Sequence, residues 1–311
     1  MYNEEQKWAF IAASYPNEAK QDKVAGLFAL FTPYEEAWGI DLVRQHIDRL
    51  QPAFDEIAKS ISATKVRALL SALKKYRLWY LATHPNAVSA GVALLKLNIE
   101  DKLRDCMVAS PAHLKLVMDQ VLDPPEMGTP DCIYRVYLWL AFAGVPRDRA
   151  TLVTVDEVDF YLMQIHHDGR DYRIYPEGLA EIHRLCESDS LVSIHRNPDY
   201  ERPRPRIEGN QLLRGVSLSQ SQVDAICKNL SKRLDKTKWA LTYENMQACG
   251  LYFEKYEQER AGLAVSFVEE TRQRLADLAL ANGTVTEDNR YKIRGRYEKG
   301  YNQWKALYKV E

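Results

Sequence analysis

The chain has 311 residues, of which 46% are hydrophobic, so it is long enough for two domains that each bury a core. The 42 Lys and Arg residues nearly balance the 43 Asp and Glu residues, so the net charge of −1 does not indicate a polyanionic partner. Evidence for such a partner must come from the local distribution of charge. Five widely spaced cysteines without a C-x-x-C pair argue against a zinc cluster and a secreted disulfide framework. Since no signal-peptide pattern and no run of about 18 apolar residues occurs, we expect a cytoplasmic protein without a membrane span.

Residues 1–122 have the periodicity of a helical domain, with apolar residues at three- and four-residue spacing and few Pro or Gly. Local charge changes sign within it, because residues 1–58 hold ten acids and five Lys or Arg, whereas residues 59–77 hold six Lys or Arg and no acid. A helical wheel from Thr64 separates two faces. The apolar face carries Val66, Leu69, Leu70, Leu73, Tyr76 and Tyr80, and the opposite face carries Arg67, Ser71, Lys74 and Lys75. This predicts an amphipathic helix whose basic face is either solvated or bound to a polyanion.

Residues 123–130 contain three prolines and end any helix, because proline lacks an amide donor and clashes with the preceding turn. We therefore predict one domain at 1–122, a linker at 123–130 and a second domain at 131–311. The expected elements of the second domain are a helix at 133–143, strands at 156–160, 161–166 and 172–175 with a hairpin turn at Asp168-Gly169, a helix at 176–186, an extended Arg-rich connector at 198–205 and a helix from Ser221 onward. The predicted fold class is mainly α with a small antiparallel sheet, or α+β.

Three stretches of the chain, Lys65–Leu81, Tyr137–Phe160 and Tyr172–Leu179, are similar to parts of the phage integrase, or tyrosine recombinase, family. Within the second stretch, Gly144 to Asp159 matches the spacing of that family without a gap. The resemblance covers most of residues 60–260. It implies a helical core-binding domain of the SAM-like type, followed by a catalytic-type domain, which together clamp duplex DNA.

Members of that family cleave DNA with a tyrosine, while two arginines, a histidine and a further His or Trp hold the transition-state charge and a hairpin lysine protonates the leaving oxygen. In this chain the position of the first arginine is Pro146, with Arg147 one residue late and Arg149 in the place of an acid. No lysine occurs between Lys115 and Lys228, so the hairpin offers Arg170, which cannot release a proton near neutral pH.

The segment Leu241–Gly250 looks like the helix start that bears His, two intervening residues and Arg in the family, but those positions read Glu244 and Gln247. The last histidine of the chain is His195, so no later histidine can replace them. Four tyrosines lie near the C-terminus, at Tyr291, Tyr297, Tyr301 and Tyr308, yet a phenol with a pKa near 10 is a poor nucleophile without positioned help. We therefore predict no catalytic residues and the loss of strand cleavage.

Local charge favours DNA as the partner, because residues 196–238 and 290–309 are also rich in Lys and Arg, which makes three basic stretches. We predict a double-stranded DNA-binding protein encoded by a phage or prophage, which regulates transcription in a bacterial cell by occupying a site without cutting it. The expected DNA contacts are Lys65, Arg67, Ser71, Lys74, Lys75, Arg147, Arg149, Arg170, Arg173, Arg202, Arg204, Arg206, Lys228, Lys232, Arg233, Asn245 and Gln247. For Asn245 and Gln247, capping of their helix is the alternative role.

Two other functions remain open, a divergent active recombinase with Arg147 or Arg149 displaced into place, and an interaction module that binds no nucleic acid. No cofactor is expected, since the sequence has neither G-x-x-x-x-G-K nor G-x-G-x-x-G. No metal is expected either, because the adjacent His166 and His167 would point to opposite faces of a strand. An aromatic stripe at Tyr297, Tyr301, Trp304 and Tyr308 predicts a C-terminal helix that docks on its own domain or on a second copy, which would make a homo-oligomer.

Overall fold

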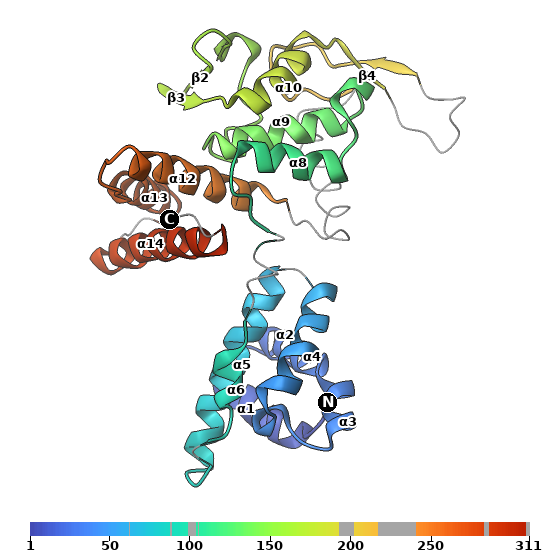
Figure 1. Ribbon diagram of the computed structural model, residues 1–311, viewed down its shortest axis with the longest axis vertical. Coiled ribbons are helices and arrows are strands. Elements are labelled where there is room, and N and C mark those ends of the chain that lie inside the picture. Colours follow the sequence, from blue (N-terminus) through green and yellow to red (C-terminus); the bar gives the residue numbers. More distant parts are fainter. Residues whose placement is uncertain are drawn as a thin grey trace. The chain divides into compact units, whose positions relative to one another are not determined.

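The computed structural model describes residues 1–61, 63–87, 89–98, 104, 106–192, 202–216, 241–282 and 286–308 (Figure 1). The chain consists of two compact units, Met1–Asp105 and Cys106–Glu311, and it is mainly helical with a small antiparallel sheet, as the sequence predicts. The division lies earlier than the predicted linker at 123–130, because the helix that precedes this stretch packs within the second unit. Within the described residues, no helix has the length and apolar character needed to cross a membrane.

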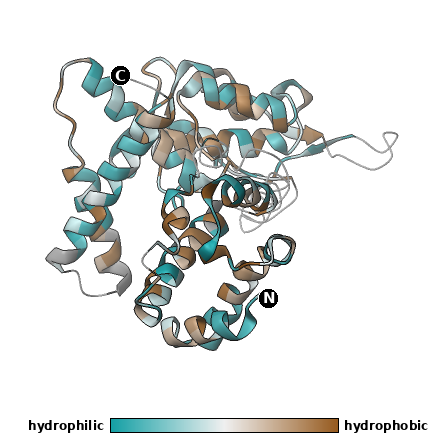
Figure 2. Ribbon diagram, turned by 60° about the horizontal axis from the view of Figure 1, so that its bottom comes forward, coloured by the Kyte–Doolittle hydropathy of each residue, from teal (hydrophilic) through white to brown (hydrophobic). Residues whose placement is uncertain are grey.

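The first unit is built from helices whose apolar faces meet around one core. Its helices are α1 (Glu4–Ser14), α2 (Glu18–Ala29), α3 (Thr32–Trp38), α4 (Ile47–Ser60), α5 (Ala63–Thr83) and α6 (Val92–Lys96), with a short 3-10 turn at Leu42–Arg44. The long helix α5 contacts α1, α2 and α6. The Tyr76 ring of α5 lies 5.2 Å from the ring of Phe10 and 5.3 Å from that of Phe28, and all three side chains are fully buried. Figure 2 shows how hydrophilic and hydrophobic residues alternate along these helices, as amphipathic packing requires.

A buried charge cluster adds polar contacts to this core. The Lys7 ammonium of α1 donates a 2.6 Å hydrogen bond to Glu35 of α3, and both side chains are fully buried. The hydroxyl of Tyr76 donates to Asp41 over 3.1 Å, which ties α5 to the same cluster. Burial raises the pKa of Glu35, whereas the hydrogen bond from Lys7 opposes that rise. The orientation of α5 is therefore fixed by specific polar bonds as well as by apolar packing.

The second unit combines helices with two small sheets. Its helices are α8 (Pro111–Val121), α9 (Asp131–Phe142), α10 (Pro176–Glu187), α12 (Tyr243–Arg260), α13 (Val268–Asn282) and α14 (Glu287–Tyr308), with 3-10 turns at Pro125–Met127 and Val155–Glu157. Strands β1 (Val158–Asp159), β2 (Gln164–His167) and β3 (Arg170–Arg173) form one antiparallel sheet, and β4 (Ser190–Val192) pairs with β5 (Pro203–Pro205) in another. Every residue of α9 is buried, because α10 and α12 both pack against this helix.

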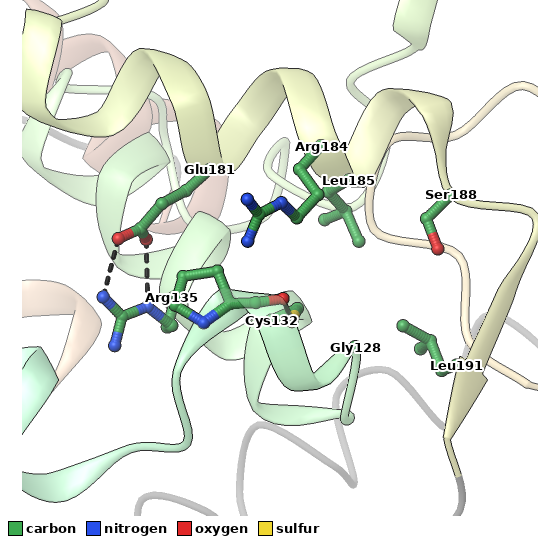
Figure 3. Close-up of a pocket in the computed structure, with 9 residues that line it drawn as sticks. Gly128, Cys132, Arg135, Glu181, Arg184, Leu185, Ser188 and Leu191 are labelled. Carbon is green, nitrogen blue, oxygen red and sulfur yellow. Dashed lines mark hydrogen bonds and ion pairs between the residues drawn. The ribbon is translucent and has the colours of Figure 1, made fainter. Parts of the chain in front are cut away.

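A fully buried arginine joins three helices of this unit. The Arg135 guanidinium of α9 makes two hydrogen bonds to Glu181 of α10, of 3.0 and 2.6 Å (Figure 3), and it also contacts Asp119 of α8. The indole of Trp139 donates to the same Glu181 carboxylate over 3.0 Å. Because α9 ends at Phe142, this network also positions the loop that follows it.

The predicted hairpin and its flanking helix are confirmed. Strands β2 and β3 pair directly, and the turn residues Asp168 and Gly169 have φ values of 50° and 71°, as a tight two-residue turn requires. Helix α10 begins at Pro176, as predicted. The predicted strand 161–166 begins later, at Gln164, because Tyr161 to Met163 form a turn. The first part of the helical region predicted from Ser221 onward lies outside the described residues, and its later part contains α12, α13 and α14.

Candidate nucleic-acid interface

The basic face predicted for residues 64–80 is present on α5. Val66, Leu69, Leu73, Tyr76 and Tyr80 are buried, and Leu70 is half-buried. All five predicted contacts on the opposite side are exposed, namely Lys65, Arg67, Ser71, Lys74 and Lys75. The periodicity of the sequence therefore places these polar side chains on the outer surface of a helix held by an aromatic core.

Most of these cations have no acidic partner. Among the residues that the structure describes, no carboxylate forms an ion pair with Arg67, Lys74 or Lys75. The Lys75 ammonium lies 4.9 Å from the centre of the Tyr15 ring, and Lys20 of α2 lies 5.9 Å from the same ring. Lys20 therefore extends the basic face, which we define as Lys20, Lys65, Arg67, Ser71, Lys74 and Lys75. Sequence reasoning missed Lys20, since no spacing rule relates α2 to α5.

In the second unit, the loop after α9 meets the start of α12. Arg147 forms a 2.5 Å ion pair with Glu244, and both side chains are more than 60% exposed. The amide of Gln247 donates to the carbonyl oxygens of Gly144 and Val145, over 3.3 and 3.2 Å. Glu244 and Gln247 of α12 therefore both contact the loop that follows α9.

The β2–β3 hairpin supplies a third part of this site. Arg149 lies 3.3 Å from Asp168 in the hairpin turn. Arg173 pairs with Glu257 over 2.7 Å, and Arg170 donates to Gln273. Four of the predicted arginines of this unit are therefore gathered around one loop and one hairpin, and three of these four face a carboxylate. A carboxylate lowers the attraction of its arginine for a phosphate, so this site is a weaker anion site than the basic face.

The histidines of the hairpin are engaged elsewhere. His166 is exposed and contacts Asp171 over 2.6 Å, whereas His167 is buried and contacts Glu157 over 2.9 Å. The two rings therefore lie on opposite faces of the strand, as predicted. In the described part of the chain, no three His, Cys, Asp or Glu side chains gather in an arrangement that could hold a metal ion.

The C-terminal aromatic stripe packs on its own unit. The Tyr301 hydroxyl donates to Glu259 over 2.5 Å, the Trp304 indole donates to the carbonyl of Val108 over 2.8 Å, and Tyr308 donates to that of Met107 over 2.7 Å. Burial and the Glu259 carboxylate both raise the pKa of Tyr301, which makes its phenolate harder to form. Along α12, Glu259 is about 22 Å from Glu244 at 1.5 Å per residue, so Tyr301 is remote from Arg147. The homo-oligomer stays a prediction.

Of the three arginines predicted as DNA contacts around the proline-arginine connector, two are exposed and one is buried. Arg202 and Arg204 are exposed, but Arg206 is buried, and its guanidinium donates to the carbonyl oxygens of Leu185, Ser188, Leu212 and Arg214. Burial, with the nearby Arg214, lowers the pKa of Arg206 to about 10. The prediction that Arg206 contacts DNA is therefore wrong, because its donors are used to close the loop around it.

The remaining predicted contacts divide into two groups. Asn245 lies in the first turn of α12, where its backbone amide donates to the cap residue Thr242. Lys228, Lys232 and Arg233 lie outside the described residues. Compared with known proteins, the chain matches no family model and no curated protein.

Proposed function

We propose that this protein binds double-stranded DNA without cleaving it. The observation that carries the proposal is the basic face of α5, where the exposed Arg67, Lys74 and Lys75 form no ion pair with a carboxylate of the described residues. Lys and Arg in such an arrangement release counterions from DNA when they contact phosphates, and Ser71 can donate a further hydrogen bond. Within the described residues, no carboxylate has to be displaced from Arg67, Lys74 or Lys75 before these side chains contact DNA phosphates.

The second unit supports the absence of cleavage. Glu244 carries a negative charge at a position where a recombinase holds the transferring phosphate, and Gln247 is used to hold the loop at Gly144. Removing a single preorganised donor of this kind costs about 10²–10³ in rate. Tyr301, the most buried of the four C-terminal tyrosines, donates its hydroxyl hydrogen to Glu259 and not to a base near Arg147.

The same proposal includes the biological role. A recombinase-like clamp that has lost its chemistry would occupy a DNA site and regulate transcription there, in the manner of a phage or prophage repressor. This role rests on the resemblance of residues 60–260 to the tyrosine recombinases and on the basic face.

The first prediction concerns the basic face. In duplex DNA selected by the protein from a randomised library, Arg67→Ala and Lys74→Ala should each weaken binding and reduce the slope of log affinity against log salt by about 1. The measurement is a fluorescence-anisotropy titration at several salt concentrations. Arg49→Ala, which removes one exposed cation from α4, is the matched control and should leave the slope unchanged. Equal effects of Arg49→Ala and Lys74→Ala would show that net charge, and not this face, governs binding.

The second prediction concerns the site in the second unit. Glu244→Gln keeps the shape of the side chain but removes the charge that pairs with Arg147, so DNA affinity should rise about two- to fivefold at low salt, as expected for an exposed ion pair. Glu187→Gln removes an equally exposed acid at the end of α10 and should have no effect. If Glu244→Gln leaves affinity unchanged, DNA does not contact the loop that carries Arg147.

A further inference from the structure

The first unit contains a pocket on a different part of its surface from the basic face. Its volume is about 480 Å³. It is lined by residues 43–47 at the 3-10 turn and the start of α4, by Tyr80 near the end of α5, and by Ala87, residues 89–93 and Lys96. No Asp or Glu lines the pocket. Arg44, His46 and Lys96 are among its lining residues. The pocket wall therefore carries Arg44 and Lys96 as cations, while the His46 ring contacts Asp48, which is not part of the lining, over 2.9 Å.

A buried amide in this pocket has an unused donor. Gln45 is 8% exposed, and its Oε1 accepts a 2.8 Å hydrogen bond from the backbone N–H of His46. This bond fixes the amide so that Nε2 is the free end, and Nε2 has no hydrogen-bond partner among the described residues. A buried donor left without a partner destabilises the folded protein, so an acceptor at this point would be stabilising.

The arginine beside it is held in position. Nε and Nη2 of Arg44 both donate to the Tyr80 hydroxyl, over 3.1 and 3.0 Å, and these bonds leave other guanidinium hydrogens available. The Tyr80 ring is in turn stacked on His84, with a 4.2 Å separation of the ring centres. Lys96 adds an exposed cation that pairs with no carboxylate in the described chain. The Arg44 fork therefore stays in place without a ligand.

We propose that this pocket binds a small molecule through a phosphate or carboxylate group, with Gln45 Nε2, Arg44 and Lys96 as its donors. An oxyanion accepts several hydrogen bonds at once, and arginine is suited to bind it through two parallel bonds. The pocket is larger than a single phosphate ion, and Val43, Ile47 and Ala93 supply apolar wall for the rest of a ligand. This inference goes beyond DNA binding by α5, since it requires no nucleic acid.

The test uses the full chain and inorganic phosphate as the probe, in the absence of DNA. Phosphate at constant ionic strength should raise the melting temperature in a saturable way, and chloride should not. Lys96→Ala and Arg44→Gln should each weaken the apparent phosphate affinity at least fivefold, whereas Arg49→Ala, on the exposed side of α4, should leave it unchanged. The melting temperatures of the unliganded variants show whether each variant still folds.

The outcomes separate two sources of the oxyanion. Saturable stabilisation that depends on Arg44 and Lys96 supports a free small-molecule ligand. If phosphate has no effect but the same variants weaken DNA binding, the pocket holds a DNA phosphate and the proposal is overturned. An equal response in wild type and in both pocket variants would also overturn it. Loss of DNA binding in Lys74→Ala with an intact phosphate response would leave this proposal standing.

Discussion

Replacing Glu181 by alanine is expected to destabilise the second unit by about 3–5 kcal/mol, because it leaves a buried arginine without its main partner. Arg135 is fully buried, and Glu181 accepts two of its hydrogen bonds together with that of Trp139. Nη1 of Arg135 already has no partner among the described residues, so Glu181→Ala would leave still more of the guanidinium without an acceptor. The remaining contact, to Asp119, reaches partly solvated surface.

The measurement is urea-induced unfolding of the full chain, with hydrogen exchange of α9 and α10 peptides to assign the change to this unit. Glu187→Ala, also on α10, is the matched control. Glu187 pairs with His183 at the surface, so its loss should cost less than about 1 kcal/mol. Similar losses for both variants would contradict the role given to the buried network.

Gly250→Ala is expected to destabilise the second unit at or above the usual 1–3 kcal/mol for overpacking. A Cβ at this position would lie 1.8 Å from the carbonyl oxygen of Phe142, which is a backbone atom at the end of α9. Helices α9 and α12 make the most extensive contact between helices of this unit, so they would have to separate. Because α9 leads into the loop of Arg147, that separation would also break the Arg147 ion pair with Glu244.

Gly295→Ala provides the control with the opposite sign. Gly295 lies within α14, and an added Cβ there would meet no atom within 4 Å. Alanine at this position should therefore stabilise the helix by about 0.5–1 kcal/mol. Thermal unfolding of the two variants compares the same chemical change in a tight and in an open position. A stabilising Gly250→Ala would mean that α9 and α12 are not in close contact.

The parts of the fold that follow local rules could be predicted from the sequence. The wheel from Thr64 gave the faces of α5 correctly, because burial of one helix face follows the 3.6-residue period. The turn at Asp168-Gly169 was predictable because both positions need positive φ. The boundary between the units could not be placed, since the prolines at 124 and 125 end a helix without ending a domain.

The electrostatics of the site depend on contacts far apart in sequence, and these could not be predicted. The resemblance to the recombinase family drew attention to Pro146, Glu244 and Gln247, where a member of that family would have catalytic residues. It did not indicate that Glu244 pairs with Arg147. The sequence around Arg206 has the composition of an exposed connector, but the guanidinium donates hydrogen bonds to four carbonyl oxygens. The same lack of local signal hid the position of Lys20 beside Tyr15.

The most direct test of the central claim uses one reaction with a nicked duplex that carries the selected DNA site. The nick would trap any covalent phosphotyrosyl adduct, and the same sample can be run on a native gel and on a denaturing gel. We expect a salt-sensitive complex on the native gel and no adduct on the denaturing gel. A covalent adduct that disappears when one of Tyr291, Tyr297, Tyr301 or Tyr308 is changed to phenylalanine would contradict the account, as would the absence of any complex.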